Sequence, residues 1–358
     1  MEENPFFYLT NAGAITIYGW SQQAYSQSFF DINLAIPSTI NGLPVTGIGD
    51  DAFLQTVSLT SVTIPGSVTS IGASAFSSCS GLINVSIANG VASIGPYAFA
   101  GTALPGVTIP ASVTKIGPGA FESCARLTAI TVDAQNAFYR SVDGVLFDKI
   151  QSSLVEYPYG IPGSYTIPQS VTSIGAEAFG GCAQLTGITI PGRVNSIGNS
   201  AFADCASLTS VTIPGSVTNI ADNAFASDSR LADVFFKGNA PTANASVFGC
   251  GCGDHDTAAT VYYLPGATGW SNTFCGLPAV LWNPLIQTGD GNFGVRNGQF
   301  GFNITGTANI PIVVEGCANA AGPVWVPLQS LTLTNGLFHF SEPVEANSPG
   351  RYYRIGSP

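Results

Sequence analysis

Charge is the scarcest property of this sequence. Only 9% of its 358 residues are charged, and ten Lys and Arg residues stand against 21 Asp and Glu residues, which gives a formal net charge of −11. Proteins that bind nucleic acids neutralise phosphates with clustered basic side chains. The basic residues here are scattered and form no patch, so the sequence argues against a nucleic-acid partner.

Long apolar runs are missing as well. No stretch of 18 apolar residues occurs, which predicts that no helix spans a membrane. The first twenty residues also lack the basic segment and the apolar core of a signal peptide. Either a leader has been removed and Met1 stands in its place, or the chain is cytoplasmic. The low charge and the abundance of Thr and Gly favour the first interpretation, so we expect a secreted or cell-surface protein.

Residues that serve catalysis are sparse. The two His residues lie in different segments, no G-x-S-x-G motif occurs, and no motif pairs two carboxylates. We therefore expect no enzymatic activity, no cofactor and no catalytic residue. One local cluster, CGCGDHD from Cys250 to Asp256, holds residue types that ligate metals. Its Cys-x-Cys spacing is not the usual one and no second pair lies nearby, so we expect a polar loop and no metal site.

What the chain does have is a recurring sequence motif. VTIPGSVTSIGASAFSSCSGL, from Val62 to Leu82, returns with small changes at three later places. Its Ala-Phe pair recurs at a period of about 23 residues, which is typical of a solenoid of leucine-rich repeats. The Phe residues of this pair are Phe53, Phe76, Phe99, Phe121, Phe179, Phe202 and Phe225. We interpret the 58-residue interval after Phe121 as one repeat that carries about 35 extra residues.

The motif predicts a strand followed by a turn. Val62 and Ile64 are two residues apart, so both point to one face of a strand and Thr63 points to the other. A Pro-Gly pair then turns the chain, and Ala75-Phe76 is expected on a helical or 3₁₀ turn that buries the ring. One unit cannot bury these groups alone, so stacked units are expected to pair their strands in parallel, about 4.8 Å apart.

The cysteines divide into two groups. Four of the eight, Cys79, Cys124, Cys182 and Cys205, follow a repeat Phe by three residues, which predicts a column of buried free thiols. For an oxidising compartment, the alternative is a disulfide between Cys275 and either Cys250 or Cys252. The sequence leaves the disulfide state of these three and of Cys317 open.

The pattern TIPxSVTxIGxxAFxxC closely resembles the BspA-type leucine-rich repeats of bacterial surface proteins, and the resemblance covers roughly residues 10–240. It implies a β-rich solenoid and a secreted or surface-exposed adhesion or interaction protein, with no catalytic motif to transfer. NAFYRSVDGVLFDKIQSSLVEYPYG resembles an island that recurs in this family. Within it, residues 142–147 and 154–157 are expected to be two short strands around a polar turn.

We therefore expect four parts. Residues 1–53 form an N-terminal cap and first repeat, and residues 54–240 form the repeats, with the island at about 133–163. Residues 241–284 resemble a terminal cap, because Tyr and Trp side chains suit the cover of an open sheet end. Residues 285–358 alternate apolar runs with Gly, Asn and Pro turns, as in a small all-β sandwich. This last segment resembles a C-terminal β-module of exported proteins from environmental bacteria.

The outward strand positions are the candidate binding face. They carry small hydroxyl side chains with almost no charge: Thr63, Ser86, Thr108, Thr131, Thr166, Thr189, Thr212 and finally Phe235. One explanation is the strand propensity of Thr. The functional explanation is a flat platform for a protein or glycan partner. We therefore expect a non-catalytic interaction scaffold. The alternatives are self-assembly into a fibre or surface layer, and a carbohydrate-binding accessory module.

Overall fold

The computed structural model describes residues 5–20, 32–249, 258–344 and 350–357. The predicted loop from Cys250 to Asp256 lies outside the described residues. Contacts divide the chain into two units: unit 1 comprises Met1–Ala232 and Pro241–Ala258, and unit 2 comprises Asp233–Ala240 and Ala259–Pro358. Each unit has its own core, and each is described by itself.

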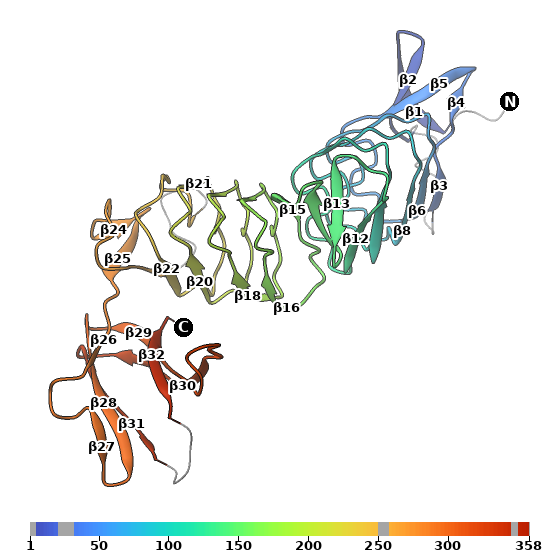
Figure 1. Ribbon diagram of the computed structural model, residues 1–358. Helices are drawn as coiled ribbons and strands as arrows, with labels where there is room; N and C mark the ends of the chain where they lie inside the picture. Colours follow the sequence, from blue (N-terminus) through green and yellow to red (C-terminus); the bar gives the residue numbers. More distant parts are fainter. Residues whose placement is uncertain (1–4, 21–31, 250–257, 345–349, 358) are drawn as a thin grey trace. The chain divides into compact units, whose positions relative to one another are not determined.

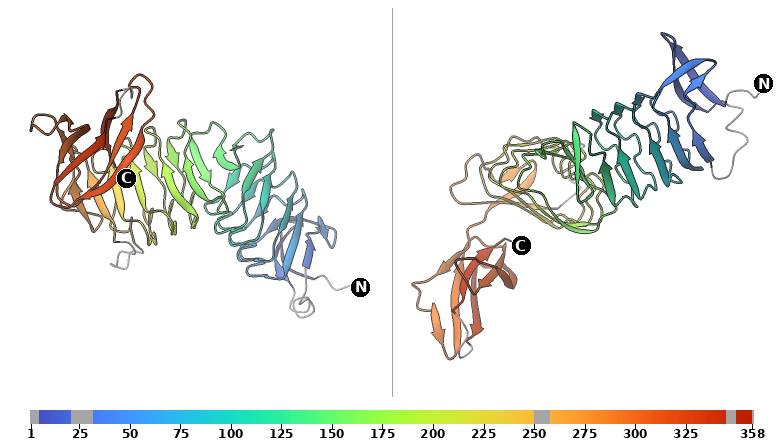
Figure 2. Two further views of the ribbon diagram at one scale, coloured as in Figure 1. Left: turned by 90° about the horizontal axis from the view of Figure 1, so that it is seen from below. Right: turned by 45° about the vertical axis from the view of Figure 1, so that its right-hand side comes forward.

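Unit 1 is a β-solenoid of about 23 residues per turn, as predicted, and its successive turns lie side by side (Figures 1 and 2). Residues one period apart pair in parallel, for example Val62 with Val85 and Ile71 with Ile94. Each turn supplies a front strand of four to six residues and a back strand, which is two residues long in the regular turns. The front strands are β3 (Ile32–Ala35), β6 (Leu59–Ile64), β8 (Asn84–Ile87), β10 (Gly106–Ile109), β12 (Ala129–Val132), β16 (Gly163–Thr166), β18 (Leu185–Thr189) and β20 (Ser210–Ile213).

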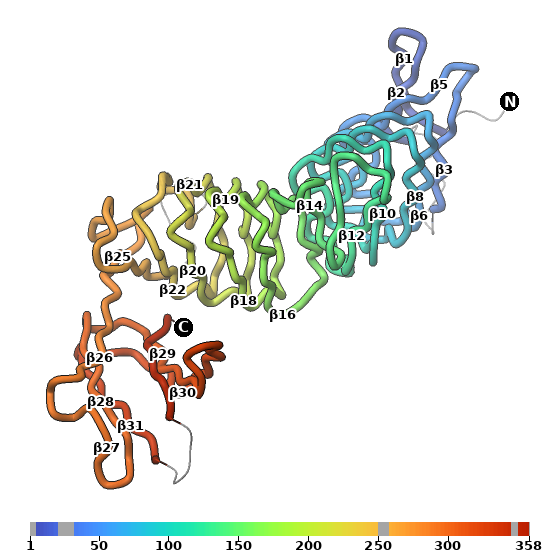
Figure 3. The backbone as a smooth tube through the Cα atoms, in the orientation of Figure 1, coloured from blue at the N-terminus to red at the C-terminus, as the bar shows by residue number. Residues whose placement is uncertain are grey.

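The back strands form two longer sheets. The first runs in the order β1 (Phe6–Asn11), β2 (Ala14–Trp20), β5 (Leu43–Ile48), β7 (Ser70–Ile71), β9 (Ser93–Ile94) and β11 (Lys115–Ile116), with β4 (Thr39–Ile40) paired to β5. The second contains β13 (Tyr139–Val142), β14 (Val145–Asp148), β15 (Ser153–Glu156), β17 (Ser173–Ile174), β19 (Ser196–Ile197) and β21 (Asn219–Ile220). The tube in Figure 3 follows the chain through these turns. The hairpin β1–β2 begins the first sheet.

The Ala-Phe segment is a turn rather than a helix. No helix occurs in the described ranges, so the expected helical or 3₁₀ turn is wrong. The N–H of Phe76 donates to the carbonyl of Ala98 in the next turn, at 2.8 Å, instead of to its own turn. The same bond recurs with Phe99 and Ala120. The Phe N–H is thus held by the next turn, while Ser77 and Cys79 donate within the segment, to the carbonyls of Ser74 and Phe76.

The repeat Phe rings form a stacked ladder in the core. All seven predicted rings are buried, and centroids of successive rings lie 5.2 Å apart for Phe53 and Phe76 and 5.3 Å apart for Phe76 and Phe99. Phe248 continues this ladder, 5.8 Å from Phe225. It lies 23 residues after Phe225, but Val replaces the preceding Ala there, which hides it from the Ala-Phe pattern.

Tyr157 corrects the interpretation of the 58-residue interval. Its N–H donates to the carbonyl of Ala178 and its ring lies 5.0 Å from that of Phe179, as a repeat Phe would. The interval therefore holds two turns, of 36 residues from Phe121 and 22 residues to Phe179. The extra length is 13 residues rather than 35, because 36 exceeds a 23-residue turn by 13.

The island is a three-stranded meander. β13 pairs antiparallel with β14, and β14 pairs antiparallel with β15. Asp143 and Gly144, with φ of 51° and 81°, make the two-residue turn between the first two strands. The expected single strand over residues 142–147 is therefore wrong, because Asp-Gly reverses the chain within it.

The predicted column of free thiols is present. Cys79, Cys124, Cys182 and Cys205 are buried and unbonded to one another. The thiols also make hydrogen bonds: Sγ of Cys79 donates to the carbonyl of Phe53 at 3.0 Å, one turn away. Cys275 and Cys317 are free as well. The four column cysteines therefore act as small buried donors that hold neighbouring turns together.

Unit 2 contains two groups of strands. The first is β22 (Asp233–Phe236), β23 (Thr260–Tyr263), β25 (Leu277–Leu281) and β24 (Thr273–Phe274). In the second, β26 (Leu285–Gln287), β27 (Gly294–Arg296), β28 (Gln299–Thr305) and β31 (Leu337–Pro343) form one antiparallel sheet, and β30 (Val326–Leu333), β29 (Ile310–Cys317) and β32 (Tyr352–Gly356) form another. Phe302 and Phe340 from one sheet and Ile312 from the other share a buried core. The expected strand-rich C-terminal region is confirmed.

Candidate interaction surface

The front strands of unit 1 present small polar side chains to solvent. In β6, Val62 and Ile64 are buried whereas Thr63 between them is exposed. This alternation follows from the two-residue period of a strand with one buried face. Parallel pairing then places outward residues opposite each other: Thr63 lies beside Ser86, and Thr108 beside Thr131.

The structure places most of the predicted face residues at the surface. Thr63, Ser86, Thr108, Thr131, Thr166 and Thr189 are exposed, and Thr212 is half-buried. Phe235 is a correction: it belongs to unit 2, is only 4% exposed, and stacks 4.9 Å from the ring of Tyr262. Phe235 therefore packs in a core and offers no surface for a partner.

The face is also less continuous than expected. Seven of its eight strands form three separate sheets in the pairing pattern, β3-β6-β8, β10-β12 and β16-β18, and β20 belongs to none of these. Thr131 and Thr166, which flank the island, are not paired with each other in that pattern. The predicted column is thus a series of short rows.

A second outward column was missed by the sequence interpretation. On each front strand, the residue two positions before the named Thr or Ser lies on the same face. These residues are Ser61, Asn84, Gly106, Ala129, Ser164, Gly187 and Ser210, all small and uncharged. The spacing of two residues could have revealed them. Together the two columns make what we call the Thr face, a surface two residues wide.

The hydroxyl groups of the Thr face bond to their own sheet. Oγ1 of Thr108 and Oγ1 of Thr131 lie 2.8 Å apart, and Thr131 also donates to the carbonyl of Val107 at 3.1 Å. Near the N-terminal end, the hydroxyl of Ser61 donates to the side-chain oxygen of Asn33 at 2.5 Å. The hydroxyls are thereby oriented in rows, with accepting lone pairs left for a partner.

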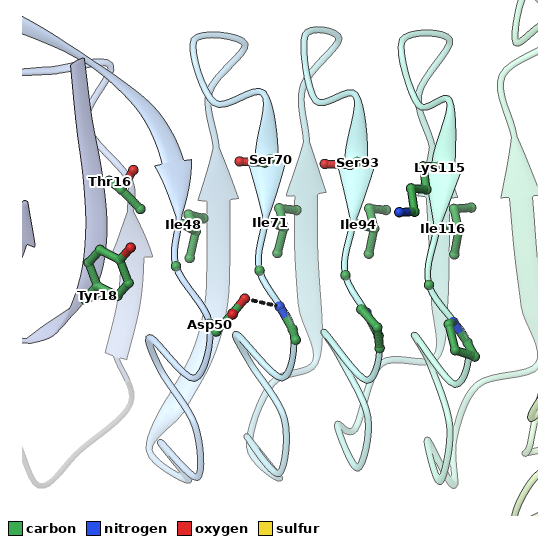
Figure 4. A pocket seen from close by; sticks show the side chains of 17 residues that line it. Thr16, Tyr18, Ile48, Asp50, Ser70, Ile71, Ser93, Ile94, Lys115 and Ile116 are labelled. Atoms are coloured by element: carbon green, nitrogen blue, oxygen red, sulfur yellow. Dashed lines mark hydrogen bonds between the residues drawn. The ribbon is translucent and has the colours of Figure 1, made fainter. Parts of the chain in front are cut away.

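The back strands of the first sheet hold a groove of about 660 Å³ (Figure 4). Ser70, Ser93 and Lys115 lie along its upper part in the view, and Tyr18 stands at one end. The side chain of Asp50 accepts a hydrogen bond from the N–H of Ala73 at 2.7 Å. We call this hollow the back groove. It crosses several turns of the solenoid.

Glycine makes the back groove. A Cβ on Gly72 would lie 2.5 Å from the backbone nitrogen of Asp50, and one on Gly95 would lie 2.6 Å from that of Ala73. The Ile-Gly pair of the repeat is therefore required by close stacking of the turns, and it leaves the strand ends without side chains. Recurrence of Ser-Ile-Gly in the sequence is the signal that could have located this groove.

The described residues contain no group of three or more His, Cys, Asp or Glu side chains placed to hold a metal ion. Among them there is also no helix that is both long and apolar enough to cross a membrane. Hydroxyl rows, and a groove whose charged lining residues are Asp50 and Lys115, can offer hydrogen bonds and van der Waals contact to a bound molecule.

Comparison with protein families gives one match. The model for the BspA type leucine rich repeat region matches residues 46–158 and 162–257 in six copies, which is more than half of the chain. No curated protein matches the chain.

Solved structures of leucine-rich repeat proteins resemble this chain. A leucine-rich repeat protein from Eubacterium ventriosum is 23% identical over 72% of this chain and 75% of its own, with a TM-score of 0.52. A leucine rich cell surface protein from Faecalibacterium prausnitzii is 24% identical over 74% of this chain and 94% of its own, with a TM-score of 0.38. The first likeness supports the solenoid fold.

Proposed function

The chain belongs to the BspA-type leucine-rich repeat family, and on that premise we propose that it is a non-catalytic interaction scaffold that works outside the cell. Leucine-rich repeat solenoids stack to give extended surfaces that suit large partners. The low charge of the chain fits a secreted or cell-surface location. Its partner is a protein or a glycan on an extracellular surface.

The observation that carries this proposal is the composition of the Thr face. None of the front strands carries a charged residue, and their outward positions hold small uncharged groups, many of them hydroxyls. Short hydroxyl side chains lose little conformational entropy when they are covered. An uncharged face also avoids the cost of burying an unpaired charge. The Thr face therefore suits a broad, flat contact.

A binding screen with a paired variant tests the face. The probes are immobilised purified matrix proteins and a glycan array. The double variant Thr108→Lys with Thr189→Lys puts two charges on separate sheets of the face. We expect it to bind the probe recognised by the wild type about tenfold or more weakly. Gln169→Lys with Gln184→Lys, at exposed positions outside the front-strand face, is the matched control and should leave binding unchanged.

Two other outcomes would redirect the proposal. If Tyr18→Ala abolishes glycan binding and the Thr-face variant does not, the back groove is the binding surface, and the weaker carbohydrate-binding alternative gains support. If sedimentation over a concentration series shows growing polymers, the alternative of self-assembly into a fibre or layer is favoured. A monodisperse monomer together with loss of binding in the Thr-face variant supports the proposal.

A further inference from the structure

The island rejoins the solenoid through a carboxylate where every other turn uses backbone. In the regular turns, the N–H of a repeat Phe donates to the carbonyl of an Ala in the next turn, as Phe99 does to Ala120 and Phe179 does to Ala201. At the island, Phe121 faces Glu156 instead. The Glu156 carboxylate accepts hydrogen bonds from the N–H groups of Phe121 and Ala120. We call this junction the seam.

Glu156 occupies a position that holds Ala in the other turns, except for Val247 before Phe248. It directly precedes Tyr157, as Ala178 precedes Phe179, so a carboxylate replaces a methyl group inside the core. It is only 3% exposed, and its Oε2 atom has no hydrogen-bond partner. A buried unpaired carboxylate oxygen is costly when the group is ionised. Burial, followed by the charge of Glu122, raises the pKa of Glu156 well above its ordinary value.

Two further carboxyl groups lie at the seam. A Cβ on Gly119 would lie 2.6 Å from the ring of Tyr97 and 3.0 Å from Oε2 of Glu122, which places both side chains over this glycine. The hydroxyl of Tyr97 then donates to Oε1 of Glu177 at 2.8 Å, across 80 residues of sequence. Tyr97 thus ties the turns before the island to the turns after it, and its anchor is a carboxyl group.

The groups that face these carboxyls are acidic or neutral. The charge of Asp204 acts on the pKa of Glu122, that of Glu122 on the pKa of Tyr159, and that of Glu156 on the pKa values of the Cys124 and Cys182 thiols. Both ion pairs within the described ranges belong to unit 2, so no cation pairs with the seam. Burial, then the charges of Glu177 and Asp204, raises the pKa of Glu122 to about 7. Burial also raises the pKa of Glu177.

We propose that the seam is a proton-controlled joint in the solenoid: protonated Glu122, Glu156 and Glu177 keep the turns on either side of the island closed against each other, and ionisation opens the joint locally. The sign follows from linkage. When the folded state raises the pKa of a carboxyl group, its proton stabilises the fold fully at a pH below the ordinary pKa of the group. This stabilisation is lost as the pH rises through the pKa of the folded state. The seam is therefore closed near pH 5 and weakened near pH 8. The proposal does not depend on which surface binds a partner.

Hydrogen exchange followed by mass spectrometry tests the joint on the intact chain. Peptides that contain the amides of Phe121 and Tyr157 report the seam, and a peptide over residues 72–79, with the regular turn of Phe76, is the internal reference. After correction for intrinsic exchange, protection of the seam peptides is expected to fall at least about tenfold more than that of the reference between pH 5 and pH 8.

Variants separate protonation from general loosening. Glu122→Gln, Glu156→Gln and Glu177→Gln together remove the three ionisable carboxyls and keep hydrogen-bonding side chains, so the extra fall in protection should disappear; single Glu122→Gln should reduce it. Asp51→Asn, which neutralises an exposed carboxylate in another turn, should retain it. Equal protection at both pH values, an equal fall in the reference, or a fall that persists in the triple variant overturns the proposal. Recovery of protection at pH 8 on adding CaCl₂, relative to EDTA, would overturn it too, because a cation would then be the closing agent.

Discussion

At the scale of single residues, Asp228 departs most from the chemistry of its column. It follows Phe225 by three residues, where the turns of the six earlier repeat Phe residues carry Cys or Thr, and it is fully buried. Its Oδ1 atom accepts a hydrogen bond from the N–H of Cys205 at 2.7 Å, but Oδ2 has no partner. Burial raises the pKa of Asp228 to about 8. The protein therefore holds a proton here that the unfolded chain releases.

We predict that Asp228→Cys makes unfolding less dependent on pH. Because the folded pKa is raised, the stability gained from the proton is complete below pH 3.8 and is lost as the pH rises through about 8. The free energy of unfolding of the wild type should thus fall between pH 5 and pH 9, by roughly 2–4 kcal/mol from this group. The variant should lack that part of the fall in urea titrations at the two pH values. A parallel fall in wild type and variant would contradict the prediction.

At the scale of elements, the island depends on one buried amide. Asn136 is 0% exposed, and its Nδ2 group donates to the carbonyls of Pro110 and Val113 at 2.8 and 2.9 Å. Its Oδ1 atom accepts from the N–H groups of Phe138 and Tyr139, both at 2.8 Å. Two hydrogen bonds thus hold the entry of the island on the preceding turn, and two fix the local backbone of that entry.

We predict that Asn136→Ala lowers the free energy of unfolding by about 3–5 kcal/mol, because two carbonyls and two N–H groups would lose their partners. Urea unfolding followed by circular dichroism measures this. Asn33→Ala, at an exposed residue that accepts side-chain hydrogen bonds from Thr60 and Ser61, is the control and should cost less than about 1 kcal/mol. Equal losses in the two variants would show that the buried amide has no special role.

The elements also show how far sequence reasoning reaches. The 23-residue period predicted the buried Phe ladder and the parallel turns, because every repeat has apolar residues at the same positions. It failed where one turn departs from the pattern: Tyr157 replaces Phe, Glu156 replaces Ala, and the Asp143-Gly144 turn interrupts an apolar run. The burial of Phe235 could not be predicted from its strand position either, since its cover comes from Tyr262 and Trp282 later in the chain.

At the scale of the whole molecule, unit 1 should behave as a one-dimensional stack, in which each turn contacts mainly its neighbours. Deleting residues 199–221 removes one 23-residue period and joins Gly198 to Asp222, which restores the repeat pattern. Phe179 would then stack on Phe225. We predict a folded protein that melts cooperatively about 5–10 °C below the wild type, because one set of interfaces is lost while the register is kept.

Deleting residues 199–209 removes 11 residues and is the control for register. It leaves half a turn, so later front-strand residues would meet back-strand positions and the Phe rings would lose their places in the ladder. This variant should show no cooperative transition by circular dichroism and should be cleaved rapidly by protease. If the full-period deletion is equally disordered, turns of unit 1 are not interchangeable, and the solenoid is specified by particular contacts such as Tyr97 with Glu177 rather than by its period.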